Sequence, residues 1–327
     1  MTHSSRNHRP WAARVLAIGG AMLLLSSCHK GGPPPALPVT RAPVPSWDQL
    51  RNATYQSVGE ESTLTLRAGH WEGAPYLDGG AARPSADLLE GFRLVGDVDG
   101  DGVDDALVLI ASRSGGTGEN TYLALVQTKA GAPVNTSTAL VGDRIQIRRG
   151  MLEGRRIVLE AVQAGPSDAL CCPGELVSRS WQVVSGTLQE SATPDSTARL
   201  TLDAIEGEWV LRKWTRDELA PGEPRVTLRV ADGVLNGRAA CNGYSSRPRA
   251  GDMPGVFTVG PVVSTRVACP DSVMKIETRY FDLLGRVRQF GFIAGRLVLS
   301  YEKDSLDAAM IFDRVAPRDT SRTAPPR

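Results

Sequence analysis

The sequence predicts a mainly β fold of the α+β class, organised as two small β-rich domains. Its 34 glycines and 22 prolines indicate many turns and few long helices. Short runs in which polar and apolar residues alternate, for example residues 63–67, have the two-residue period of β-strands. With 327 residues, 41% of them hydrophobic, the chain is long enough for two ordinary domains that each bury a core.

Residues 1–27 have the pattern of a signal peptide. Arg6, Arg9 and Arg14 give it a positive start, and the apolar run 15–25 follows. As a helix this run would span only about 16 Å, which is too short for the ~30 Å core of a bilayer. Such a segment is removed from the mature protein and takes no part in its fold.

Residues 25–28, Leu-Ser-Ser-Cys, resemble a bacterial lipobox, in which Cys28 is lipidated and becomes the first residue of the mature protein. The alternative is an ordinary signal sequence that happens to contain a cysteine. Several acyl chains on Cys28 would hold the protein stably on a membrane. Residue 29 is histidine rather than aspartate, so no inner-membrane retention signal is apparent. The expected location is the cell envelope, on the outer membrane and facing the oxidising periplasm.

Three segments are expected to lie outside the two domains. Residues 28–45 predict an extended tether, whose proline-rich part, residues 30–45, would reach about 50 Å at ~3.1 Å per residue. The polar break at residues 191–201 is interpreted as a linker between the domains 46–190 and 202–315. Residues 316–327 are polar and contain proline, so we expect a disordered tail.

The first domain, residues 46–190, is expected to contain little helix. Residues 47–50, with Ala53 and Tyr55, favour one short helix. The unbroken apolar run 106–111 predicts a buried strand, and the glycine-rich hairpin 114–118 leads to its partner strand. That hairpin could cradle an anion, but a tight turn between two strands explains it equally well. The predicted strands are 63–67, 106–111, 122–126, 144–148, 156–160 and 177–184.

An aspartate-rich loop precedes the predicted buried strand and has the spacing of a calcium site. Carboxylates at Asp97, Asp99, Asp101 and Asp105 occupy positions 1, 3, 5 and 9 of the loop, and the backbone carbonyl of Val103 occupies position 7. Oxygen ligands at these positions can wrap Ca²⁺ at ~2.3–2.6 Å. The sequence therefore predicts Ca²⁺ as a cofactor, in a structural role more than a catalytic one.

Two observations limit this interpretation. Position 12 of the loop is Val108 rather than glutamate, so the loop is not a helix-loop-helix EF-hand. It is similar to the loops that precede strands in FG-GAP proteins, but only one copy occurs, which argues against a propeller. The alternative is a solvated acidic turn, although acids packed this closely repel one another strongly without a counter-ion.

The second domain, residues 202–315, is expected to combine short strands with one clear helix. Asp271 is expected to cap this helix and Gly285 to end it. The apolar face of the helix is expected to comprise Val273, Ile276, Tyr280 and Leu284, at spacings of three and four. The predicted strands are 208–211, 225–230, 235–240, 257–259 and 297–301.

Cys241 and Cys269 are 28 positions apart, and each ends a run that is typical of a strand and stands before turn residues. A disulfide between them would join two strand ends in a small sheet. With Cys28 set aside, the four remaining cysteines allow three connectivities, so the pairing is an expectation. Cys171 and Cys172 are adjacent, and free thiols or a link to a partner remain open for them.

Four separated motifs of the second domain occur in one order. They are Trp209, then Gly237-x-x-x-Cys241-Asn242, then Ser264-Thr265-Arg266-x-x-Cys269, then a helix after Pro270 that carries Glu277 and Tyr280-Phe281.

This order resembles the META domain of the HslJ-like family over residues 202–315. The resemblance implies a curved sheet around one helix and a place in the bacterial envelope, where lipoproteins with this domain are common. It implies no catalytic residues. One departure is that Tyr244 is followed by Ser245-Ser246-Arg247, where the family often has an aromatic stretch.

Several classes of function are disfavoured. A formal charge of +1 gives no electrostatic case for nucleic acid. Beyond Cys28 the only histidines are His29 and His70, which argues against Ser-His and Cys-His hydrolases. Ser272-Val-Met-Lys275 matches a motif of penicillin-recognising enzymes, but its companion motifs are absent.

The preferred hypothesis is a non-enzymatic envelope lipoprotein, held on the membrane by its anchor, that binds an envelope protein or ligand or serves in the stress response. The alternative is a periplasmic inhibitor of envelope-directed enzymes such as lysozyme.

Overall fold

The computed structural model describes residues 43–169, 172–303 and 306–315. The predicted signal peptide, Cys28, most of the predicted tether and the predicted tail 316–327 lie outside these ranges. The described residues belong to one compact unit. Within them, no helix is both long enough and apolar enough to cross a membrane.

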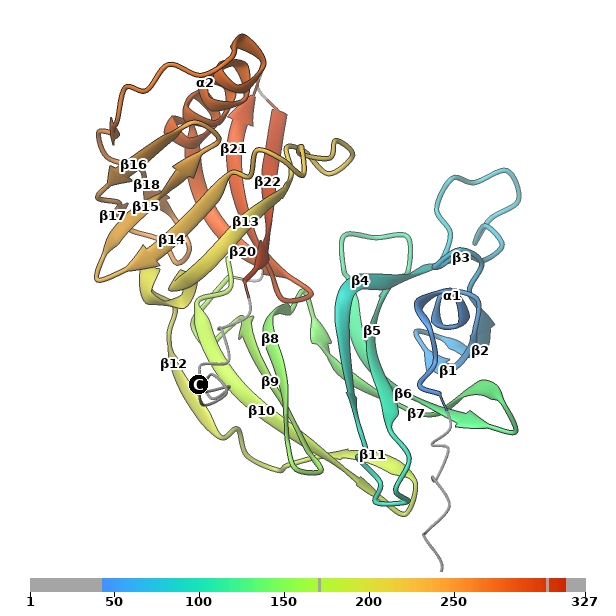
Figure 1. The fold of residues 1–327 in the computed structure, drawn as a ribbon. Helices are drawn as coiled ribbons and strands as arrows, with labels where there is room; N and C mark the ends of the chain where they lie inside the picture. Colours follow the sequence, from blue (N-terminus) through green and yellow to red (C-terminus); the bar gives the residue numbers. More distant parts are fainter. Residues whose placement is uncertain (1–42, 170–171, 304–305, 316–327) are drawn as a thin grey trace, which may run out of the picture. The chain divides into compact units, whose positions relative to one another are not determined.

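The fold is mainly β, as predicted, and its sheets are curled (Figure 1). It begins with a short helix and a hairpin, α1 (Trp47–Leu50), β1 (Thr54–Val58) and β2 (Glu61–Thr65). A five-stranded antiparallel sheet follows, and its spatial order is its sequence order. Its strands are β3 (His70–Glu72), β4 (Ser85–Gly96), β5 (Asp105–Arg113), β6 (Asn120–Lys129) and β7 (Ala132–Asp143).

Strand β5 is buried on both faces, which explains its unbroken apolar sequence. Ala106, Val108 and Ile110 pack into one core with α1 and the β1–β2 hairpin. Leu107 and Leu109 point the opposite way and join a second core with residues of β8 to β11. Successive side chains of a strand alternate between faces, so a strand between two cores needs apolar residues at every position.

A second sheet has the order β11-β10-β9-β8, and β12 also pairs with β10. The predicted linker 191–201 is therefore partly a strand, because residues 196–199 form β12. The strands of this sheet are β8 (Gln146–Glu153), β9 (Arg156–Gln163), β10 (Glu175–Val184), β11 (Thr187–Glu190) and β12 (Ser196–Arg199).

The third sheet has eight strands in the order β19-β16-β15-β14-β13-β22-β21-β20. A 3₁₀ turn, Leu202–Ile205, precedes it, and a two-stranded sheet of β17 (Arg249–Ala250) and β18 (Phe257–Thr258) lies between its strands in sequence. The eight strands are β13 (Gly207–Lys213), β14 (Thr227–Ala231), β15 (Val234–Ala239), β16 (Asn242–Ser246), β19 (Val263–Ser264), β20 (Val287–Ile293), β21 (Arg296–Lys303) and β22 (Leu306–Arg314).

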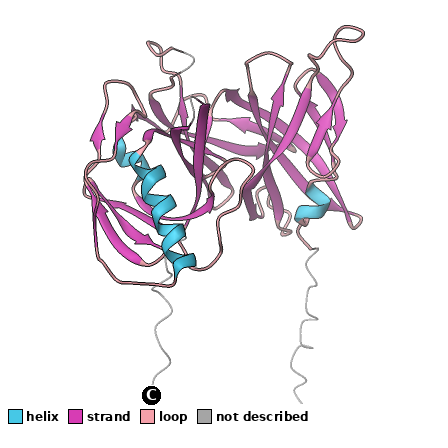
Figure 2. Cartoon of the chain, turned by 90° about the horizontal axis from the view of Figure 1, so that it is seen from above, coloured by secondary structure: helices cyan, strands magenta, loops and turns pink. Residues whose placement is uncertain are grey.

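One long helix, α2 (Asp271–Gly285), packs against this sheet (Figure 2). Tyr280, Leu283 and Leu284 are buried and share a core with side chains of the sheet. The helix ends at Gly285 as predicted, but Asp271 is not its cap. Pro270 occupies the N-cap position with φ −54° and ψ 148°, and Asp271 is the first helical residue. A carboxylate there still interacts favourably with the helix dipole.

Other expectations needed correction at the start of the chain. Tyr55 lies in β1 rather than in the first helix, and its hydroxyl donates a 2.8 Å hydrogen bond to the carbonyl of Leu50. The predicted tether ends before residue 45, because its last residues contact the sheet. Thr128 Oγ1 donates to the carbonyl of Pro43 at 2.7 Å, and Arg93 donates to the carbonyl of Pro45 at 3.1 Å.

Candidate functional site

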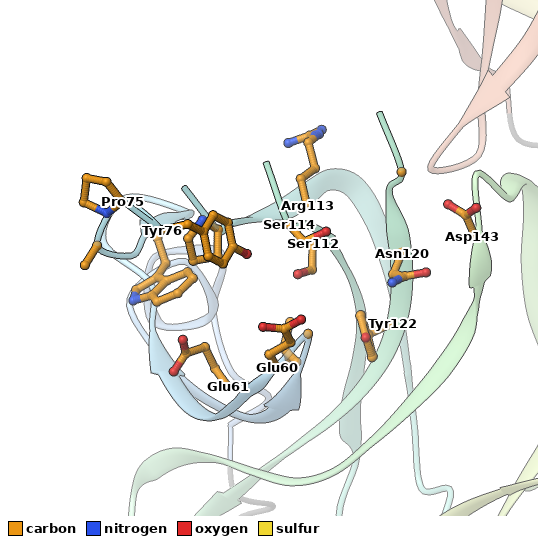
Figure 3. A pocket seen from close by; sticks show the side chains of 16 residues that line it. Glu60, Glu61, Pro75, Tyr76, Ser112, Arg113, Ser114, Asn120, Tyr122 and Asp143 are labelled. Atoms are coloured by element: carbon orange, nitrogen blue, oxygen red, sulfur yellow. The ribbon is translucent and has the colours of Figure 1, made fainter. Parts of the chain in front are cut away.

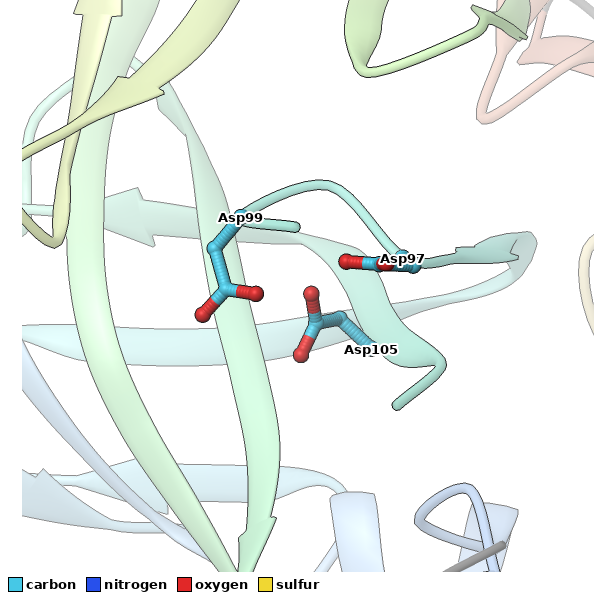
Figure 4. Close-up of side chains that lie close together, drawn as sticks. All are labelled: Asp97, Asp99 and Asp105. Carbon is cyan, nitrogen blue, oxygen red and sulfur yellow. The ribbon is translucent and has the colours of Figure 1, made fainter. Parts of the chain in front are cut away.

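The aspartate loop connects β4 to β5 and brings three carboxylates together (Figure 4). One oxygen from each of Asp97, Asp99 and Asp105 lies within 4.8 Å of the others. Asp105 is the first residue of β5 and is only 2% exposed, whereas Asp97 and Asp99 are half-buried. The loop therefore holds three acidic groups at the start of the most buried strand of its sheet.

The loop is shaped by hydrogen bonds between its carboxylates and its own backbone. Asp97 accepts from the amides of Gly100 at 2.6 Å and Gly102 at 3.0 Å. Asp99 accepts from the amide of Asp101 at 3.1 Å, and Asp101 accepts from that of Val103 at 2.8 Å. Gly100 and Gly102 have φ of +87° and +84°, a conformation that favours glycine. These bonds explain why aspartate and glycine alternate over residues 99–102.

Asp105 is held from outside the loop by Gln127 of β6. The Gln127 Nε2 donates to Asp105 at 3.0 Å and to Asp99 at 2.7 Å, and the amide of Val98 donates to Asp105 at 3.2 Å. Burial raises the pKa of Asp105, the two hydrogen bonds oppose that rise, and the charges of Asp99 and Asp101 add to it. The ionised form of Asp105 is thus disfavoured by burial and by the neighbouring charges. A bound cation would favour that ionised form.

The structure brings together three of the five predicted ligands. Asp101 and Val103 are not part of the close group, since the Asp101 carboxylate bonds to the Val103 amide. Carboxylate oxygens are the ligand type that Ca²⁺ prefers, and the group offers one such oxygen from each of its three residues. Sequence reasoning missed Gln127, whose signal is a polar residue at the end of the apolar run of β6.

A second cluster surrounds the disulfide, which forms between Cys241 and Cys269 as expected. Cys241 follows β15, and Cys269 stands shortly before α2, so the bond ties the sheet to the start of the helix. The expected strand before Cys269 is short, because β19 comprises only Val263–Ser264. Cys171 lies outside the described residues, and the pairing of Cys171 and Cys172 stays open.

Asn242 and Glu277 form a buried network beside the disulfide. Glu277 of α2 is 6% exposed and accepts from the Asn242 amide at 2.6 Å and from Asn242 Nδ2 at 2.9 Å. Asn242 Oδ1 accepts from Thr265 Oγ1 and from the amide of Val267, both at 2.7 Å. The network therefore joins β16, α2 and the segment that follows β19. Sequence reasoning identified these residues as motif members but not their contacts.

Tyr244 and Tyr280 complete the junction between sheet and helix. Their hydroxyl oxygens are 2.6 Å apart, and the Tyr244 hydroxyl also donates to the carbonyl of Thr227 at 3.1 Å. Burial raises the pKa of both tyrosines, and each stays a neutral phenol in the folded protein at ordinary pH. These polar groups are engaged with one another, which is the pattern of a structural network.

The fold and these networks define a mainly β protein whose C-terminal part is a disulfide-closed, curled sheet around one helix. Residues 198–311 match the META domain family, so this part of the chain is a META domain. The match does not include the aspartate loop. No curated protein and no solved structure matches the chain.

Proposed function

We propose that the protein is a non-enzymatic lipoprotein of the bacterial envelope, anchored through Cys28, in which the META domain belongs to a binding or stress-related module. The observation that carries this proposal is the Cys241–Cys269 disulfide inside a META domain. Disulfides persist in oxidising compartments such as the periplasm. The lipobox at residues 25–28 agrees with that location.

A binding role rather than catalysis is supported by the way the META domain uses its polar groups. Glu277, Asn242 and Thr265 are hydrogen-bonded to one another, and the hydroxyls of Tyr244 and Tyr280 are paired. Groups committed in this way hold three chain segments together. They leave no activated nucleophile beside a base within this network.

Calcium is proposed as a structural cofactor of the aspartate loop. Asp97, Asp99 and Asp105 would supply carboxylate oxygens, and Asp101 and Val103 are the further ligands that the spacing predicts. The ion would cancel the repulsion among the carboxylates at the entry to β5. It would thereby stabilise the sheet that the loop precedes.

The anchor is tested by Cys28→Ala in the full chain. We expect the variant to appear in the soluble periplasmic fraction, while the wild-type protein sediments with outer membranes, because the acyl chains are the proposed attachment. Fractionation after a salt wash measures this. The matched control is Cys172→Ala, which should stay with the membrane. A Cys28→Ala protein that still sediments would refute the anchor.

The role is tested by capture of partners from envelope fractions with the anchored protein. A specific envelope protein or ligand is the expected result. Lysozyme inhibition is the alternative, and it would be detected as a loss of lysozyme activity when the purified protein is added. Hydrolysis of an envelope substrate by the protein itself would contradict the proposal.

A further inference from the structure

A pocket of about 560 Å³ lies beside the five-stranded sheet, and its lining includes no residue of the aspartate loop or of the META domain (Figure 3). Segments that are distant in the sequence form it: the β1–β2 turn, β3, the loop after β3, and the adjoining ends of β5, β6 and β7. Its lining combines acidic and aromatic side chains, notably Glu60, Glu61, Trp71, Tyr76 and Tyr122.

The pocket carries negative charge that is not neutralised. Among the described residues, the side chains of Glu60 and Glu61 have no hydrogen bond or ion pair. The one cation of the lining, Arg113, is bound by Asp87 at 2.7 Å and by Glu119 at 2.5 Å. Two carboxylates already face that guanidinium, so it does not offset the two glutamates.

A third acidic residue of the lining, Asp143, has partners for its carboxylate, unlike Glu60 and Glu61. It is paired with Arg144 at 2.7 Å and accepts from the amide of Glu119 at 3.1 Å. The charge available to a ligand is therefore that of Glu60 and Glu61, which stand side by side at the start of β2. Figure 3 shows both around the same open space as Tyr76 and Ser112.

Tyr122 adds a polar group to the pocket from a side chain that is otherwise buried. It is 8% exposed, and its hydroxyl has no hydrogen-bond partner among the residues that the structure describes. Its ring packs in the core, whereas the hydroxyl oxygen is not among the fully buried atoms that lack a partner and so is open to solvent. Because Tyr122 lines the pocket, its hydroxyl is available to whatever enters it.

The aromatic rings are positioned by close packing. A Cβ atom at position 73 would lie 2.8 Å from the ring of Trp71 and 2.8 Å from Pro84, so only glycine leaves these groups where they are. Trp71 is half-buried and Tyr76 is 48% exposed, which leaves ring surface for a ligand. The faces of aromatic rings carry negative electrostatic potential and attract cations.

We propose that this pocket binds an organic ammonium group, primary or quaternary. The unpaired glutamates supply charge, the rings supply cation–π contact, and the Tyr122 hydroxyl supplies an acceptor. The same charge disfavours anions, which argues against an anion cradle at the glycine-rich hairpin 114–118 on the rim. A neutral sugar could stack on the rings but would leave both carboxylates uncompensated. The inference names a ligand class for the proposed binding role and rests on it.

The test is calorimetric titration of the full-length protein in neutral detergent. The probes are tetramethylammonium and cadaverine as cations, N-acetylglucosamine as a neutral sugar, and inorganic phosphate as an anion. We expect saturable binding of one or both cations, weakened by salt, and no binding of the sugar or of phosphate. The two cation titrations show whether a quaternary or a primary ammonium group is preferred.

Glu61→Gln keeps the shape of the side chain and should weaken cation binding about tenfold, since it removes a charged partner. Asp78→Asn is the matched control, because Asp78 is exposed on the loop that carries Tyr76 and does not line the pocket. It should leave affinity unchanged. Tyr122→Phe removes only the hydroxyl and should weaken binding severalfold, with an unchanged melting temperature.

Three outcomes overturn the assignment: no cation binding by the wild-type protein, stronger binding of sugar or phosphate than of either cation, or unchanged affinity in a folded Glu61→Gln protein. The membrane fractionation of Cys28→Ala does not depend on any of these titrations. Failure of the ligand assignment and failure of the proposed envelope role are therefore distinguishable.

Discussion

Gly237 lies in β15 at a point where two strands and an aromatic ring meet. A Cβ atom added there would come 2.1 Å from the carbonyl oxygen of Thr227 and 3.1 Å from the ring of Tyr244. The first distance is to backbone, which cannot move aside as a flexible side chain can. The same Thr227 carbonyl accepts the hydroxyl of Tyr244. Gly237 thus permits the contact between β14, β15 and the tyrosine pair.

Gly237→Ala is expected to destabilise the protein by about 2–4 kcal/mol, because the added methyl forces the strands apart and breaks the Tyr244 bond. Urea unfolding followed by circular dichroism measures the change. Gly243→Ala is the control, since its added Cβ would meet nothing closer than 3.8 Å. Equal stability of the two variants would show that the crowding at position 237 is easily relieved.

At this scale the sequence indicated which residues mattered and left their contacts unknown. The four ordered motifs that resemble the META domain include Gly237, Asn242, Thr265 and Glu277. That Glu277 accepts two hydrogen bonds from Asn242 depends on the packing of α2 against β16, which spacing along the chain does not encode. Gln127 escaped notice for the same reason, because its partners lie across the sheet.

The aspartate loop is an element whose conformation is held by hydrogen bonds within the loop. Its turn is closed by bonds from Asp97 to the amides of Gly100 and Gly102. Its last carboxylate, Asp105, is buried and has a raised pKa, first through burial and also through the neighbouring charges. If the loop takes up the proposed Ca²⁺, these hydrogen bonds would reduce the cost of ordering it.

Calcium is expected to stabilise the protein and raise its melting temperature. At a dissociation constant near 10⁻⁴ M, as for extracellular modules, millimolar Ca²⁺ would add about 1.4 kcal/mol. The comparison is thermal unfolding in chelator and in Ca²⁺, with Mg²⁺ expected to substitute poorly. Asp97→Asn with Asp99→Asn should abolish the response, and Asp104→Asn, outside the carboxylate group, should keep it. Identical wild-type curves with and without Ca²⁺ would mean an acidic turn only.

Elements with strong periodicity were predictable, and those with mixed sequences were not. The apolar run of β5 and the helix face containing Tyr280 and Leu284 were identified correctly. β4 was missed because a register shift between Leu88 and Arg93 interrupts its alternation. β7 was missed because its register shifts twice against β6 and its middle is rich in serine, threonine and asparagine. Such strands are specified by their neighbours in the sheet.

At the scale of the whole molecule, buried tyrosines occur in both the N-terminal cores and the META domain. Tyr55 packs in the core beneath β5, and Tyr244, Tyr280 and Tyr301 pack in the core of the META domain. Burial is the largest cause that raises the pKa of each of the four. The folded protein therefore keeps these phenols neutral at a pH at which an unfolded chain ionises them.

Below about pH 10 these tyrosines should not change the free energy of unfolding. Above about pH 10 they should lower it. The sign follows because the unfolded chain releases protons that the folded chain retains. Each tyrosine should contribute a loss on the order of 1 kcal/mol at pH 11. Urea midpoints at pH 8, 10 and 11 measure the loss, and Tyr55→Phe should make it smaller. A free energy of unfolding unchanged between pH 8 and pH 11 would contradict the expectation.

The strand order of the eight-stranded sheet in the META domain determines when, during synthesis, that sheet can fold. β13 is the first strand of that sheet to leave the ribosome, and β22, which pairs with it, is the last. Until residues 306–314 exist, β13 has one open edge, and β20 and β21 have no connection to the rest of the sheet. Pairing between distant segments is slow, and open edges invite association with other chains. Synthesis of residues 306–314 is therefore the event that allows this sheet to close.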